Sequence, residues 1–581
     1  MELPDHSSPA KRRPIDKVFY RVHAMKASDA FVWKLAVLAT VVFLALFLIR
    51  LSVDHAVRVP AKGGTFSEGI IGTPRFANPV LAVTRADKDL SALVYDGLMM
   101  LGEDGTLTSN VAKGVTVSED GLTYNVILRD DVKFHDGETL TSRDVAFTIG
   151  RIQDPLLASP LRANFDGVTT EEVGDYEINL IIPEPYAPFI ENLTFGILPE
   201  HIWRDAGSDE FPFSQHNSEP VGTGPYVIDK IERNASGIPE TYILKANTAY
   251  HIQVPKIETF ELHFYPSEAR LIEAFKKGTV SSVVGVDSAR LPEYGLDGAT
   301  HHIERTPLPR TFAVFFNQNR SAALRDSTAR KALDVAVDRE ALVEVVLGGY
   351  GNPLTSPMPR GFGVDIEEPE NMPEDELEAA RAILREGGWE INTETQIWEK
   401  TIDKTKTPLS FSIATVNNSS FEASAEFLRK TWELLGAEVD VKQFEQSDLT
   451  QSVIRPRDYE ALLFGTQLGR SLDFYSFWHS SQRIDPGLNI ALYTNITTDS
   501  ILAEMRRSTN PEGRSEAIKK FIEELKKETP AIFLYTPELL YIFPNKVTGA
   551  SFTGVGEPHE RFSRVHEWFI QTESVWPVFT E

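Results

Sequence analysis

Two histidine-containing segments hold the residue types that most readily support chemistry. The first contains His135, Asp136 and Glu138, which offer an imidazole and two carboxylates for metal binding or acid–base work. These residues surround an Asp-Gly step, which is typical of a surface turn, so we favour a turn over a metal or acid–base site. The second is the adjacent pair His301 and His302, whose side chains point to opposite faces if the segment is a strand. We therefore expect no metal site at either place.

Recognised catalytic patterns do not occur in the sequence. There is no GxSxG elbow, no HExxH helix, no phosphate loop and no GxGxxG turn, and the carboxylates are spread without a preferred pair. The chain also has no cysteine, which excludes disulfides, thiolate catalysis, Cys-ligated metals and an acylated-cysteine anchor. We expect no catalytic residue, no metal and no cofactor. A secreted hydrolase is the alternative from the enzyme class, and it would need a nucleophile and base, or two carboxylates, converging in a pocket.

The composition indicates a globular protein with an acidic surface. The 581 residues are 42% hydrophobic and 24% charged, which is enough for two or three packed domains. The first 50 residues contain eight basic and four acidic side chains, so the remaining 531 carry a net charge of −30 where the whole chain carries −26. We expect no nucleic-acid partner because a polyanion would be repelled.

One apolar segment near the N-terminus has the length of a membrane span. Residues 35–49 carry no charge, and extension to residues 31–53 gives a helix of adequate length because Lys34 and Arg50 can reach the headgroups. A cleaved signal peptide is the alternative, although the preceding region is long and no clear small-x-small cleavage site follows. We favour a retained transmembrane anchor at residues 31–53.

Basic side chains before this segment set its expected orientation. They are Lys11, Arg12, Arg13, Lys17, Arg21 and Lys26. By the positive-inside rule, residues 1–30 form a basic cytoplasmic tail and the large domain lies outside the cytoplasm. The expected location is the cell membrane, in a single-pass protein whose large domain faces the periplasm or the outer side.

Strands and helices alternate through the rest of the chain. Strands are predicted at residues 122–128, 177–182, 258–264 and 311–316, where β-branched, aromatic or alternating residues cluster between turn signals. A helix is predicted at residues 89–98, and another is capped by Asp338 and stops at a Gly-Gly pair. This order predicts an α/β protein with several sheets.

Five segments resemble the extracellular solute-binding proteins of the oligopeptide, dipeptide and nickel type (family 5), which are receptors of ABC importers. They are residues 120–129 running into 132–147, the heptapeptide 220–226, the helix pair and proline-rich exit between 315 and 359, the helix 380–389 with its glycine cap, and residues 473–481. The match covers nearly everything after the anchor. It implies a two-lobed periplasmic-binding-protein-like fold (class II) with an extra α/β subdomain inserted in lobe one.

The resemblance also implies domain boundaries and partners. Lobe one would span residues 64–305 with the insertion at about 85–200, lobe two would span 306–525, and residues 526–581 would return to lobe one. In such a fold a solute is held by hinge closure. The expected partners are a peptide or other small solute and ABC transporter permease subunits, and we expect the chain to act as a monomer.

The main ligand contact implied by the resemblance departs from the family pattern. Peptide-binding relatives hold the solute's α-amino group with a carboxylate three residues before an acidic residue, which is similar to Asp473 here. Arg470 occupies the place of that carboxylate. A guanidinium there would favour a solute carboxylate, whereas the alternative is that Arg470 pairs with Asp473 or another acid for structural reasons. Asp473 itself could still hold an amine.

Three further residues are candidates for ligand contact. Phe477 and Trp478 could stack on a solute, or they could anchor the following segment in the core. Asn317, just after a predicted strand, could hydrogen-bond a ligand backbone or cap a turn.

The expected function is therefore capture of peptides or similar solutes outside the cytoplasm for an ABC transporter. A receptor for a sugar, a metal chelate or a cell-wall fragment is the alternative on the same fold, and fold alone does not separate these. A membrane-anchored sensor or scaffold is the alternative from a different class.

Overall fold

The computed structural model describes residues 26–55, 57–296, 298–362, 364, 375–508 and 510–575. It contains two compact units. The larger is Lys62–Ile570, and the smaller combines Met1–Ala61 with Gln571–Glu581. Most of the predicted cytoplasmic tail, residues 1–25, lies outside the described residues.

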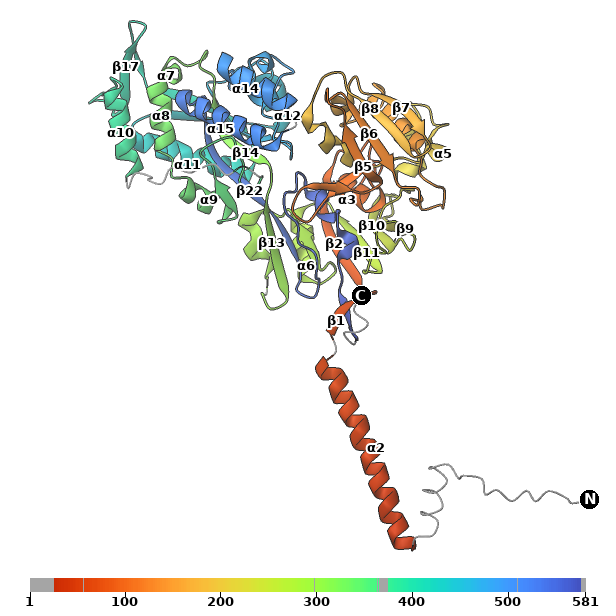
Figure 1. The fold of residues 1–581 in the computed structure, drawn as a ribbon. Helices are drawn as coiled ribbons and strands as arrows, with labels where there is room; N and C mark the ends of the chain where they lie inside the picture. Colours follow the sequence, from red (N-terminus) through yellow and green to blue (C-terminus); the bar gives the residue numbers. More distant parts are fainter. Residues whose placement is uncertain are drawn as a thin grey trace, which may run out of the picture. The chain divides into compact units, whose positions relative to one another are not determined.

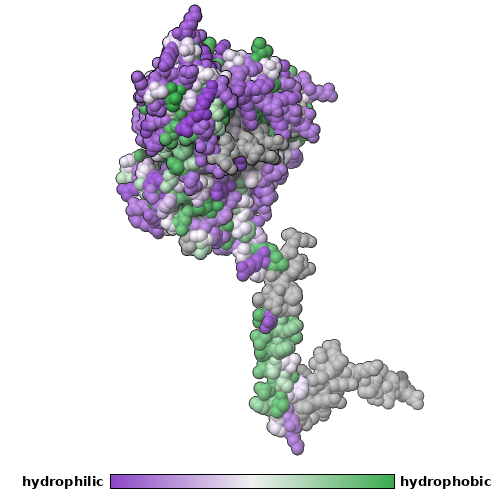
Figure 2. All heavy atoms as spheres, turned by 90° about the vertical axis from the view of Figure 1, so that its left-hand side faces the viewer, coloured by the Kyte–Doolittle hydropathy of each residue, from purple (hydrophilic) through white to green (hydrophobic). Residues whose placement is uncertain are grey.

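The smaller unit consists of a long apolar helix and a two-stranded ribbon. Helix α2 (Ala27–His55) contains a stretch of 23 residues, Ser28–Arg50, with a mean hydropathy of 2.5 and no buried part. Figure 2 shows its apolar side chains in green. Strands β1 (Val57–Ala61) and β23 (Gln571–Val575) pair antiparallel. The helix is long and apolar enough to cross a membrane, and a signal sequence would meet the same criteria.

The larger unit is built on one path of strands in the order β20-β19-β21-β14-β22-β12-β2-β11-β10-β9. The strands at one end are β2 (Thr65–Ile71), β9 (Tyr226–Arg233), β10 (Pro239–Ala246), β11 (Thr259–Tyr265) and β12 (Ser282–Val284), with β13 (His301–Pro307) beside β22. Those at the other end are β14 (Arg310–Phe316), β19 (Ser410–Val416), β20 (Glu438–Phe444) and β21 (Ala461–Gln467), with β15 (Gly351–Pro353) beside β22.

Strand β22 (Ala531–Pro544) joins the two ends of this path. Its residues 531–537 pair with β14 and β15, whereas its residues 538–544 pair with β12 and β13 (Figure 1). From this pairing we propose that residues 62–307 and 538–570 form lobe one and that residues 308–537 form lobe two. The return to lobe one at residue 526 stays a prediction, and the strand pairing leads us to propose Glu538 for this boundary, because β22 pairs with β13 only from that residue.

The sheet of lobe two is buried on both faces. Val314 and Phe316 of β14 pack in one core cluster, and the alternate residues Ala313 and Phe315 pack in a second. The helices that supply the first cluster are α8 (Ser327–Val335), α9 (Arg339–Leu347), α10 (Glu376–Glu386) and α11 (Ser419–Leu435). Those that supply the second include α14 (Ile496–Arg507) and α15 (Pro511–Glu528). Asp338 caps α9 as predicted, since its carboxylate accepts from the Ala341 amide at 2.9 Å.

The inserted subdomain carries a separate antiparallel sheet. Its order is β5-β6-β8-β7, from β5 (Ala112–Val117), β6 (Thr123–Leu128), β7 (Thr169–Gly174) and β8 (Glu177–Ile181). Helix α4 (Ser142–Gln153) packs against it. This arrangement confirms the predicted α/β architecture with an insertion in lobe one.

The helix predicted at residues 89–98 is displaced toward the N-terminus. Helix α3 runs from Arg85 to Val94, because the side chains of Thr84 and Asp87 form a capping box at its start. Tyr95 is extended and ends the helix. The four predicted strands lie within one residue of β6, β8, β11 and β14.

Candidate functional site

Two cavities adjoin the boundary between the lobes. Cavity A has a volume of ≈ 250 Å³ and is lined by lobe one together with Arg470 of lobe two. Cavity B has a volume of ≈ 380 Å³ and is lined by both lobes, with Tyr124 and Ile190 on one side and Leu472 and Ile518 on the other. Arg470 and Glu191 line both cavities. These two side chains therefore mark the centre of the candidate site.

Arg470 is held by the C-terminal part of lobe one. Its guanidinium forms an ion pair with Glu560, and its Nε donates to the carbonyl oxygen of Gly554 at 3.2 Å. Only 11% of the side chain is exposed. The structural alternative raised for Arg470, pairing with an acid, is thus the arrangement observed, with Glu560 rather than Asp473 as the partner.

Asp473 lies on the same boundary but is engaged with cations and donors of the protein. Arg506 Nη2 donates to its Oδ2 at 2.6 Å, and the hydroxyl of Tyr186 donates to the same oxygen at 3.3 Å. The Tyr475 amide donates to Oδ1 at 3.2 Å. Tyr186 belongs to lobe one, so this carboxylate is contacted from both lobes. A solute amine would have to displace one of these donors.

The aromatic candidates lie in the core of lobe two. Trp478 is 3% exposed and packs against Phe315 and Phe533, with ring centroids 6.1 Å and 5.8 Å away. Phe477 is partly buried against the same core cluster. The structure places neither in the lining of cavity A or cavity B.

Asn317 is also held inside the protein. It is 1% exposed, its Nδ2 donates to the Arg457 carbonyl at 2.9 Å, and its Oδ1 accepts from the Asn319 amide at 3.1 Å. These bonds stabilise the turn after β14, which is the alternative stated for Asn317. Of the five predicted site residues, the structure brings Arg470 and Asp473 to the boundary of the lobes and leaves Phe477, Trp478 and Asn317 within lobe two.

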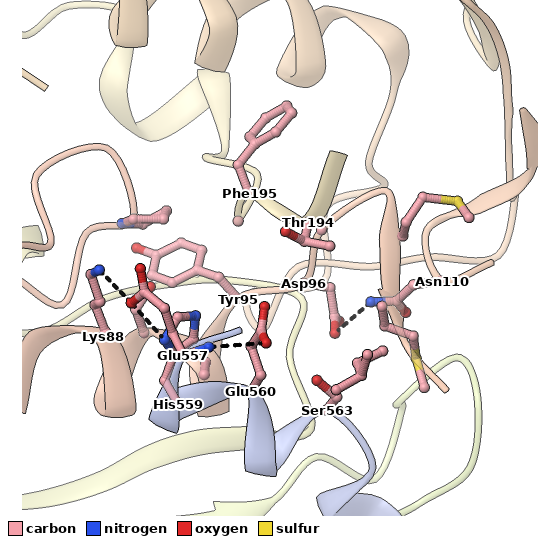
Figure 3. A pocket seen from close by; sticks show the side chains of 18 of the residues that line it. Lys88, Tyr95, Asp96, Asn110, Thr194, Phe195, Glu557, His559, Glu560 and Ser563 are labelled. Atoms are coloured by element: carbon pink, nitrogen blue, oxygen red, sulfur yellow. Dashed lines mark hydrogen bonds and ion pairs between the residues drawn. The ribbon is translucent and has the colours of Figure 1, made fainter. Parts of the chain in front are cut away.

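The interior of cavity A combines apolar walls with a few polar groups (Figure 3). Asp96 is 6% exposed and accepts from Asn110 at 3.1 Å, Thr223 at 3.2 Å and Tyr250 at 3.1 Å. Lys88 forms an ion pair with Glu557 at the other side. These groups are satisfied by the protein itself and define a rigid polar wall.

Glu191 is an acid in this region whose pKa is shifted upward. Burial raises its pKa to about 7, an effect that nearby Glu560 adds to and that Arg470 and Arg514 oppose. Sequence reasoning did not find Glu191, because it lies in the 3₁₀ segment Ala187–Thr194, which has no helical or strand periodicity. It also missed Tyr95, Tyr186 and Glu560, none of which belongs to a motif.

His135, in the first histidine segment, is bonded to backbone groups of another segment. His135 Nε2 lies 3.1 Å from the Gly224 carbonyl, and the Gly222 amide donates to His135 Nδ1 at 3.4 Å, so the ring fastens the heptapeptide 220–226. Burial lowers the pKa of His135. In the described parts of the chain, no group of three metal-ligating side chains converges.

A family model and a curated relative both match this chain over most of its length. The family model "Bacterial extracellular solute-binding proteins, family 5 Middle" matches residues 106–484. The oligopeptide-binding protein AppA of Bacillus subtilis is 25% identical over 531 residues, which cover 88% of this chain and 92% of that protein.

Solved structures share the fold. The structure of B. subtilis AppA in complex with a nonapeptide has a TM-score of 0.66 and 24% identity, covering 88% of this chain and 100% of that one. NikZ from Campylobacter jejuni in complex with Ni(L-His) has a TM-score of 0.66 and 24% identity, covering 87% and 99%. The chain therefore belongs to family 5 of the bacterial extracellular solute-binding proteins and is a solute receptor for ABC transport.

Proposed function

We propose that this receptor captures peptides at the boundary of its lobes and presents them to an ABC transporter as a monomer, while α2 holds it at the membrane. The observation that carries the proposal is the position of Arg470, a lobe-two residue that pairs with Glu560 of lobe one between two cavities. A group in either cavity would touch residues whose contacts depend on lobe closure. Solute binding is thereby coupled to the closed state.

The cavities suit a solute with several side chains. Cavity A is smaller than the roughly 300–1,000 Å³ of pockets that enclose a whole small molecule, so it accommodates one side chain or a similar group. Cavity B provides a second space on the other side of Arg470 and Glu191. Two adjacent side-chain pockets favour a peptide, and the similarity to AppA supports the same class.

Native mass spectrometry of the full chain in detergent tests the peptide proposal. Solute that co-purifies is released by denaturation and sequenced. A set of short peptides is expected. A single non-peptide species, such as a metal chelate, would overturn the peptide class and leave the receptor function in place.

Retention of α2 as a single-pass anchor requires its own experiment. The intact chain is expected to stay with membranes after alkaline carbonate extraction and to keep its original N-terminus. Placing an arginine at Leu44, near the middle of the span, costs about 3 kcal/mol of insertion and is expected to lower the membrane-bound fraction. Recovery of a soluble chain cleaved after α2 would instead identify a signal peptide.

A further inference from the structure

Glu191 differs from the other charged residues of cavity A in having no bonded partner. The lining contains one lysine, one arginine, one histidine and four acidic side chains, which are Lys88, Arg470, His559, Asp96, Glu191, Glu557 and Glu560. Lys88 and Arg470 pair with Glu557 and Glu560, His559 also lies 3.5 Å from Glu557, and Asp96 accepts three hydrogen bonds. Within the described part of the chain, no hydrogen bond or ion pair reaches the Glu191 carboxylate. The cavity is thus left with one unbonded negative group.

The two arginines that act on Glu191 form their hydrogen bonds with other groups. Arg470 bonds to Glu560 and to the Gly554 carbonyl, and Arg514 donates to the carbonyl oxygen of Ser471. Both act on Glu191 only through space. The Glu191 side chain is partly buried without having gained a donor, and a cation brought by a ligand would supply the missing interaction.

Tyr95 provides a second unbonded group in the same cavity. It is 4% exposed, and its hydroxyl has no partner among the described residues, although the residue lines cavity A. Figure 3 shows its ring within the group of side chains around the cavity. Polar groups buried to this degree are normally hydrogen-bonded, so the Tyr95 hydroxyl, which has almost no accessible surface, gains a partner when a ligand displaces the side chains that cover it.

We propose that cavity A selects solutes with a cationic nitrogen, an ammonium or guanidinium, which Glu191 binds while Tyr95 hydrogen-bonds a polar atom of the same solute. The inference deepens the proposed function and rests on it. A solute carboxylate is disfavoured, because it would lie near Glu191 and would have to displace Glu560 from Arg470. The volume of ≈ 250 Å³ fits a lysine or arginine side chain, or the amino end of a peptide.

Two pairs of tripeptide probes separate the sources of the cation. The first pair is N-acetyl-Ala-Lys-Ala-amide and its norleucine analogue, which differ in the side-chain ammonium. The second is Ala-Ala-Ala-amide and N-acetyl-Ala-Ala-Ala-amide, which differ in the terminal amine. Affinities are measured at pH 8 by calorimetry on the full chain in detergent, for the natural chain, Glu191→Gln, Tyr95→Phe and the exposed control Glu184→Gln.

The natural chain is expected to bind the cationic member of at least one pair about thirtyfold or more tightly than the neutral member. The reason is that only the cationic member forms an ion pair with the Glu191 carboxylate. Glu191→Gln should remove this preference, Glu184→Gln should keep it, and Tyr95→Phe should weaken binding of both members alike. The pair that responds identifies the side chain or the terminus as the source.

The inference is overturned if no cationic probe binds, if neutral probes bind equally well, or if Glu191→Gln keeps the preference. Binding of neutral probes, or peptides released in the mass spectrometry experiment, would leave the peptide receptor intact while removing the role of Glu191. Failure of the peptide proposal would appear separately, as a non-peptide species in that experiment.

Discussion

The guanidinium of Arg506 donates to the Asp473 carboxylate at 2.6 Å and lies 3.9 Å from the centre of the Tyr475 ring. The Asp473 side chain is only 13% exposed, and it also accepts from Tyr186 of lobe one. Removal of the guanidinium would leave a mostly buried carboxylate with neutral donors alone. The pair therefore stabilises lobe two and the contact between the lobes.

Replacement of Arg506 by methionine tests how much its pair with Asp473 contributes to the free energy of unfolding. Arg506→Met is expected to lower the free energy of unfolding by about 1–3 kcal/mol, because the desolvated carboxylate loses its charged partner. Denaturant titration of the full chain measures the change. Arg455→Met is the matched control, since Arg455 is 62% exposed and its contact with Asp485 is 3.8 Å long. A loss as large in the control would show that the effect is not specific to Asp473.

Arg470 is expected to control the balance between open and closed lobes. Arg470→Met removes an ion pair and a hydrogen bond that cross from lobe two to lobe one, so the open fraction should rise about fivefold or more. Because the chain has no cysteine, spin labels at Leu156→Cys and Val345→Cys report the distance between lobes without competing thiols.

Arg129→Met is the control for this measurement. Arg129 pairs with Asp131 and donates to the carbonyl oxygen of His251, and all three residues lie in lobe one, so the distance distribution should not change. An unchanged distribution in Arg470→Met would show that the ion pair does not favour closure.

The charge of Glu191 gives cation binding a defined pH dependence. Because burial raises its pKa to about 7, affinity for the lysine probe should rise as the pH increases from 6 to 8 and Glu191 ionises. In Glu191→Gln this rise should be absent. A slope that persists in the variant would assign the pH dependence to another group.

Folding stability should depend on pH in the opposite sense. In the unfolded chain Glu191 ionises near its ordinary pKa of 4.5, so the folded state binds the proton more tightly between pH 4.5 and 7. Relative to Glu191→Gln, the natural chain should lose stability as the pH rises through this range. Below pH 4.5 the difference in stability between the two chains should no longer change with pH. Parallel denaturant titrations at pH 4 and pH 8 measure this difference.

Gly222 is expected to be indispensable to lobe one. A Cβ at this position would lie 2.1 Å from the carbonyl oxygen of Val94, so the backbone of α3 and the heptapeptide could not approach as they do. Gly222→Ala should destabilise the protein by about 2–4 kcal/mol, as overpacking against fixed backbone does. Gly114→Ala is the control, because nothing lies within 4 Å of its Cβ. Equal unfolding midpoints for the two variants would contradict the steric argument.

The sequence predicted the parts of the fold that repeat a local pattern. The strands at 122–128 and 311–316 alternate or cluster apolar residues, and Asp338 caps its helix, so local chemistry decides these elements. The start of α3 was missed because the pair Thr84 and Asp87 was not recognised as a capping box. Boundaries between elements depend on such single side chains.

The site was less predictable, because its members meet only after folding. Arg470 and Glu560 are 90 positions apart, and nothing near either residue indicates that they pair. The raised pKa of Glu191 results from burial and from charged neighbours on other segments. Family resemblance directed attention to residues 470–478, whereas the unbonded groups lie in lobe one.

The position of β22 has a consequence for biosynthesis. The strand lies between β14 and β12 at the junction of the lobes, yet it begins only at Ala531, after every other strand of that path. A chain made from its N-terminus can assemble most of each lobe's other pairings early, but the strand that joins them is made after all of these. Until residue 544 has emerged, the nascent receptor has two unfinished sheet edges, so a chaperone that shields exposed strands would be most needed during this interval.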